Sequence, residues 1–117
     1  MIVKEHVSPD GTLRLVIDRG ESGDLTIGFR GYGWHTHGDI LAELRELPTD
    51  QAVDEFVAEV LNGIALIATS SMNGDPVDVW ICDDSHYTRK HLDPAESISF
   101  RRWNGVTVDG IADDDPT

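Results

Sequence analysis

Residues 49–69, TDQAVDEFVAEVLNGIALIAT, carry a helical pattern followed directly by a strand pattern. Apolar side chains recur there at the three- and four-residue spacing of one helix face, which predicts a helix from residue 49 or 50 to Leu61. The apolar stripe consists of Ala52, Val53, Phe56, Val57, Val60 and Leu61. Asn62-Gly63 is a typical C-terminal stop. Residues 64–69 are almost wholly apolar, which predicts a short strand buried on both faces.

Alternating apolar and polar residues predict further strands on both sides of this stretch. Before it, turn-forming residues at 8–11 and 20–23 separate three such segments, which predicts a three-stranded meander. After it, Asn73-Gly74 and residues 103–106 have the chemistry of two-residue hairpin turns, and Ile98 begins another strand pattern. This order predicts an α+β fold, with a mainly antiparallel sheet (β-β-β-α-β-β-β) and one principal helix packed on one face.

The chain has 117 residues, a length that fits one domain, which we predict over residues 1–108. Residues 109–117 hold four aspartates and are predicted to form an acidic, disordered tail. A shorter helical pattern lies between Asp39, a candidate N-cap, and Pro48. Its apolar residues are expected to lie on one side of the helix: Ile40, Leu41, Leu44 and Leu47.

The composition is strongly acidic, with 9 Lys and Arg against 22 Asp and Glu and a formal charge of −13. Such a charge repels nucleic acids and anionic membranes, and it attracts basic proteins or metal cations. The single cysteine, Cys82, excludes an intrachain disulfide and is expected to be unreactive. With no recognisable signal peptide and no apolar run of about 18 residues, the cytoplasm is the expected compartment.

The segment His35-Thr36-His37 is the first candidate site. On an extended strand, residues i and i+2 point the same way, so the two imidazoles could converge on one metal ion. Completing ligands could come from residues such as Asp39, or after folding from Asp83, Asp84, His86 or His91. The alternative is that both rings lie at a strand end, hydrogen-bonded or solvated.

Residues 33–37, Gly-Trp-His-Thr-His, resemble the metal-binding strand of the JAMM-type zinc isopeptidases and metalloproteases. This resemblance implies a divergent zinc-dependent hydrolase in which His35 and His37 bind the metal and Asp50 or Asp54 is the third ligand. The sequence departs from that family at Gly38, where a proline is usual, and it lacks a Ser-x-x-Asp at the expected spacing.

An acidic helical surface is the second candidate site. Its carboxylates repeat at helical spacing, and no lysine between Lys4 and Lys90 is available to pair with them, so they could await a basic partner. They are Glu43, Glu46, Asp50, Asp54, Glu55 and Glu59. Tyr32 and Trp34, in a glycine-rich segment, could add aromatic anchors. The alternatives are an ordinary solvated helix face and a Trp34 that closes one end of the core.

The passage from Phe29 to Asp39 and the acidic character of the whole chain resemble the small immunity-type domains of bacterial toxin systems. This resemblance implies a non-enzymatic domain that neutralises a basic partner protein and needs no cofactor. The zinc hydrolase is the alternative function. An exposed edge of the meander could also pair two copies into a homodimer. The basic pairs Arg89-Lys90 and Arg101-Arg102 are expected to bind the protein's own carboxylates.

Overall fold

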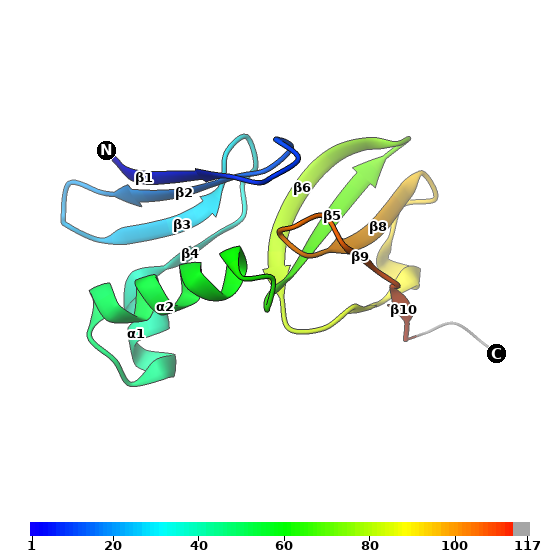
Figure 1. Ribbon diagram of the computed structural model, residues 1–117. Helices are drawn as coiled ribbons and strands as arrows, with labels where there is room; N and C mark the ends of the chain where they lie inside the picture. The colour runs from blue at the N-terminus through cyan, green and yellow to red at the C-terminus, as the bar shows by residue number, and fades with distance from the viewer. Residues whose placement is uncertain (114–117) are drawn as a thin grey trace.

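The computed structural model describes residues 1–113, apart from the side chain of His91 (Figure 1). A first four-stranded sheet has the order β1-β2-β3-β4, with strands Ile2–Val7, Arg14–Arg19, Leu25–Phe29 and His35–His37. Helices α1 (Gly38–Arg45) and α2 (Thr49–Leu61) follow it. A second four-stranded sheet has the order β6-β5-β8-β9, with β5 at Leu66–Met72, β6 at Asp75–Cys82, β8 at Glu96–Arg101 and β9 at Thr107–Val108. The remaining elements are β7 (His86–Tyr87), a short 3-10 helix (Arg89–His91) and β10 (Ile111–Ala112).

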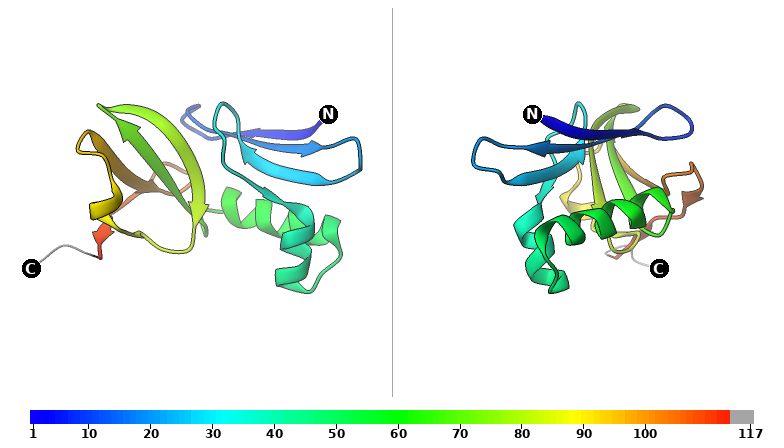
Figure 2. Two further views of the ribbon diagram at one scale, coloured as in Figure 1. Left: turned by 180° about the vertical axis from the view of Figure 1, so that it is seen from behind. Right: turned by 60° about the vertical axis from the view of Figure 1, so that its left-hand side comes forward.

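The predicted α+β class and mainly antiparallel pairing are confirmed, and α2 packs on one face of the first sheet as expected (Figure 1). The strands do not form one sheet, however. After α2 the chain enters β5, which pairs with β6 on one side and β8 on the other, so β5 is the centre of a separate sheet. The two sheets lie side by side, and the molecule is elongated, 46 × 29 × 25 Å (Figure 2). Within residues 1–113, no helix is long and apolar enough to cross a membrane.

One hydrophobic core joins the two halves. The helix-facing residues of β2 and β3 alternate as predicted, and Leu15 and Ile27 are fully buried. The predicted stripe of α2 packs against them through Ala52, Val53, Val57 and Val60. Ile67, Val79 and Trp103 of the second half belong to the same cluster. The packing is therefore continuous across the sheet boundary.

The second sheet confirms two local predictions and corrects a third. Residues 66–68 of β5 are buried on both faces, and Asn73 and Gly74 both have positive φ (53° and 87°), as a two-residue hairpin turn requires. The β8–β9 turn is longer than predicted. The Arg102 N–H donates to the Val106 carbonyl and the Gly105 N–H donates to the Arg102 carbonyl, which makes a three-residue loop with Gly105 at φ 94°.

Two arginines of the β8–β9 hairpin tie the halves together. The Arg101 guanidinium donates to Asp10 Oδ2 at 2.7 Å and to Thr12 Oγ1 at 3.0 Å, in the turn between β1 and β2. This hydrogen bond holds the pKa of the Asp10 carboxyl well below its usual range. Arg102 instead donates to the carbonyls of Gly63 and Ile64, both at 2.9 Å, just after α2 ends. The expected pairing with carboxylates is thus right for Arg101 and wrong for Arg102.

The chain after β9 is not the structureless tail that was predicted from Asp109 onward. Ile111–Ala112 forms β10, which pairs in parallel with β7. The Ile111 N–H donates to the Ser85 carbonyl and the Asp113 N–H to the Tyr87 carbonyl, both at 2.9 Å. Residues 114–117 of the predicted tail lie outside the described residues.

We expect Gly28→Ala to destabilise the protein by about 1–3 kcal/mol, the usual cost of overpacking. A Cβ at position 28 would lie 2.7 Å from the Trp34 carbonyl oxygen and 3.2 Å from the His35 Cβ, so β4 would have to move. Urea denaturation measures the change. Gly33→Ala is the matched control, because no atom lies within 4 Å of its Cβ position. Equal stability of the two variants would contradict this account of how β4 is placed.

Candidate functional site

The two histidines of β4 do converge as predicted. Strand pairing places His35 opposite Gly28 and His37 opposite Thr26, so both side chains lie on the face of the sheet that points away from α2. Their ring centroids are 4.9 Å apart, in an edge-to-face arrangement. The Nδ1 atom of His35 lies 3.1 Å from the Gly33 carbonyl oxygen. The pair lies at the sheet edge, with His35 exposed and His37 half-buried, and its rings contact each other.

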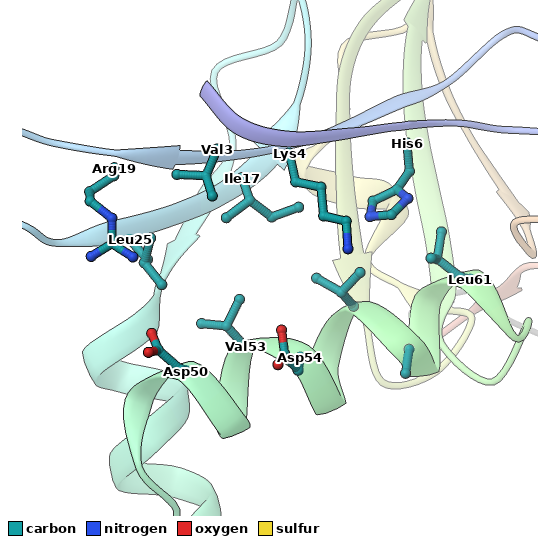
Figure 3. Close-up of a pocket in the computed structure, with 12 residues that line it drawn as sticks. Val3, Lys4, His6, Ile17, Arg19, Leu25, Asp50, Val53, Asp54 and Leu61 are labelled. Atoms are coloured by element: carbon teal, nitrogen blue, oxygen red, sulfur yellow. The ribbon is translucent and has the colours of Figure 1, made fainter. Parts of the chain in front are cut away.

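The structure does not bring Asp50 to this pair. Asp50 and Asp54 are on α2, which covers the opposite face of the sheet, and both line a groove there (Figure 3). Among residues 1–113, no group of three or more His, Cys, Asp or Glu side chains is placed to hold a metal ion. The predicted ligand set of His35, His37 and Asp50 is therefore wrong in its third member, because the sheet separates that carboxylate from the imidazoles.

Two carboxylates of the acidic helical surface bind an arginine of the same chain. Arg45, the last residue of α1, donates to Glu55 at 2.6 Å and to Glu59 at 2.5 Å. Its guanidinium lies 5.8 Å from the centre of the Phe56 ring, and the Glu59 hydrogen bond raises the pKa of Arg45. The expectation that these acids lack a partner is thus wrong for Glu55 and Glu59. The sequence has no lysine near these acids, but an arginine on the preceding helix is their partner.

The exposed side of α1 is the feature that the sequence analysis missed. Helix α1 packs through Gly38 and Leu41, which are buried, and through Arg45. Ile40 and Leu44, which the sequence pattern places on one side with Leu41, point elsewhere and are 46% and 76% exposed. The neighbouring Asp39, Glu43 and Glu46 are exposed carboxylates. We call this surface, Asp39, Ile40, Glu43, Leu44 and Glu46, the α1 face.

Tyr32 and Trp34 belong to the edge of the core. Both are half-buried and pack against the buried cluster, and the Trp34 ring centroid is 6.3 Å from that of Phe29. This agrees with the alternative in which Trp34 closes one end of the core.

A groove lies between the first sheet and α2, and two of the candidate residues line it. Its volume is about 530 Å³, and it lies beneath β1 and β2 (Figure 3). Lys4, His6 and Arg19 line the sheet side, and Asp50 and Asp54 line the helix side. Burial, and secondarily the charge of Lys4, lowers the pKa of His6. Of the predicted acids on α2, Glu55 and Glu59 therefore bind Arg45, whereas Asp50 and Asp54 line this groove.

Two other candidates have structural roles. Cys82 is partly buried, and this burial raises the pKa of its thiol, followed by the charges of Asp84 and Asp83. A raised pKa disfavours the reactive thiolate, in agreement with the expected lack of reactivity. His86 lies 2.5 Å from Asp113, and this hydrogen bond raises the pKa of His86. The pair links β7 to the end of β10.

Comparison with protein-family models, with curated proteins and with solved structures finds no match to this chain. Functional inference therefore comes from the geometry above.

We expect His6 to titrate below, and His86 above, the ordinary histidine pKa of about 6.5. His6 is desolvated in the fold, so its contribution to stability is present above the unfolded-state pKa and is lost as pH falls through its lower folded-state pKa. The contribution of His86 to stability depends on pH in the opposite direction. Its contribution is present at acid pH and is lost as pH rises through its folded-state pKa. Residue-resolved NMR titration of the ring resonances measures both.

Asp113→Asn is the control for this titration. It should return the pKa of His86 toward the ordinary value and leave that of His6 unchanged, because Asp113 contacts His86. A His86 pKa that does not respond to Asp113→Asn would contradict the assigned cause.

Proposed function

We propose that this chain is a non-enzymatic cytoplasmic domain that binds and neutralises a basic partner protein, in the manner of the immunity-type domains, and that the α1 face holds this partner. The observation that carries the proposal is the exposure of Ile40 and Leu44 (46% and 76%) beside exposed carboxylates. An apolar centre with a polar rim is the usual anatomy of a protein interface.

The charge of the chain supports a basic partner. At −13, the field of the whole protein steers a cationic surface toward it and speeds association. Glu43 and Glu46 form no ion pair within the part of the chain described, so they are available to such a surface. The buried apolar contacts would then supply most of the affinity, and the carboxylates would supply the selection of a basic partner.

The zinc-hydrolase alternative has less support, because Asp50 and Asp54 lie across the sheet from His35 and His37. The predicted homodimer through the meander edge stays a prediction. Strand β1 has a strand partner on one side in the described sheet, so its other edge could pair with a second copy.

Photo-crosslinking in the native cell tests the proposal. A photoreactive phenylalanine analogue at position 44 should give a covalent adduct with a basic protein. The same analogue at position 106, which is 55% exposed on the β8–β9 turn, is the matched control and should not. With the captured protein purified, raising the salt from about 50 to 500 mM should weaken binding by tenfold or more, since salt screens surface charges.

Two further results decide between the parts of the proposal. Glu43→Gln/Glu46→Gln should reduce the adduct at position 44, and co-expression of the domain should relieve any growth inhibition that the captured protein causes. Equal adducts at positions 44 and 106 would reject the α1 face as the interface. Binding that does not change with salt would reject the electrostatic selection of a basic partner.

A further inference from the structure

The groove between the first sheet and α2 has the dimensions of a ligand site (Figure 3). Its volume of about 530 Å³ falls in the range of roughly 300–1,000 Å³ usual for small-molecule sites. Its lining follows α2 from Asp50 to Leu61, a path of about 16 Å at the rise of an α-helix. Side chains such as Ile17, Val53 and Val57 make the floor apolar.

Opposite charges face each other across this groove. Lys4 and Arg19 extend from the sheet toward α2, and Asp50 and Asp54 stand on the helix opposite them (Figure 3). None of these four side chains forms an ion pair within residues 1–113, and Arg19 donates a hydrogen bond to the Gly23 carbonyl instead. A site with a cationic wall, an anionic wall and an apolar floor is complementary to a zwitterion whose remaining surface is apolar.

The charges also exclude other classes of ligand. A fatty acid or a phosphate compound would bring its negative charge close to Asp50 and Asp54. A polyamine would bring its positive charges close to Lys4 and Arg19. Like charges that come close together repel each other, and more strongly beside an apolar floor than in open water.

His6 supplies an independent sign of an occupant. Its ring points from β1 into the groove (Figure 3), and its Nε2 atom is buried without a hydrogen-bond partner in the described residues. Buried polar atoms in proteins nearly always have a partner. A peptide group in the groove could fill this role, since it carries both a donor and an acceptor.

We propose that this groove binds a short apolar peptide with free termini, its ammonium group against Asp50 and Asp54 and its carboxylate against Lys4 and Arg19. An extended peptide of three or four residues spans roughly 10–14 Å. It would cross the groove obliquely, because the two charged walls face each other across the width of the groove. The proposal does not rest on the proposed function, because the groove and the α1 face share no residue.

Trileucine is the test ligand, with binding measured by calorimetry and by the NMR shift of the His6 ring. We expect a Kd on the order of 1 mM or tighter. N-acetylation should weaken binding about tenfold by removing the charge that faces the aspartates, and C-terminal amidation should do the same at the cationic wall. Free leucine, which has the same charges but a much smaller apolar surface, should bind at least tenfold more weakly.

Single substitutions in the groove test which peptide terminus contacts the acidic wall and which contacts the basic wall. Asp54→Asn should weaken trileucine about tenfold but leave N-acetyl-trileucine unchanged, and Lys4→Gln should show the same pattern with the C-terminal amide. Both side chains are exposed, so these variants are expected to fold, and urea denaturation verifies this. Asp83→Asn, an exposed acid in the loop after β6, is the charge-matched control and should bind like the unmodified protein.

Three outcomes would overturn the proposal. The first is that trileucine does not bind at a concentration on the order of 10 mM. The second is that blocking either terminus leaves the binding unchanged. The third is that free leucine binds as tightly as trileucine. The last result would assign the groove to a single amino acid.

Discussion

The packing of α2 across the first sheet is the contact on which the rest of the structure depends. A helix is about 10 Å wide, whereas neighbouring strands are about 4.8 Å apart, so one helix covers roughly two strands. The apolar stripe of α2, including Val53 and Val57, packs against β2 and β3. The helix-facing side of β1 is then left partly uncovered in a four-stranded sheet. The groove is thus a direct consequence of the number of strands and the single long helix.

The arginines of this acidic chain are used mainly to hold it together. Arg45 joins α1 to α2, Arg101 joins the β8–β9 hairpin to the β1–β2 turn, and Arg14 and Arg30 both bind Glu5. A guanidinium suits this role because its planar donors can bind two acceptors at once. Since the chain has 9 basic residues for 22 acids, internal pairing leaves a large surplus of carboxylates at the surface.

Local patterns were sufficient to predict both α-helices and the longer strands, but not the short strands β4, β7 and β10. They also could not predict contacts between residues that are far apart in sequence. Three features depend on neighbours in sequence, and all three were predicted. They are the apolar stripe of α2, the buried residues of β5 and the Asn73-Gly74 turn. The shared face of His35 and His37 follows from the two-residue period of a strand in the same way. The partner of Arg101 is 91 residues away, and nothing local indicates it.

The sequence pattern also does not show which side of an element meets the core. Periodicity places Ile40 and Leu44 on the apolar side of α1, but α1 packs through Gly38, Leu41 and Arg45 instead. In this orientation Arg45 lies beside α2, where it contacts two carboxylates and the Phe56 ring. The apolar pair is exposed as a result. The orientation of α1 that brings Arg45 to the carboxylates of α2 therefore also leaves Ile40 and Leu44 exposed, so one packing arrangement gives both a structural contact and a candidate interface.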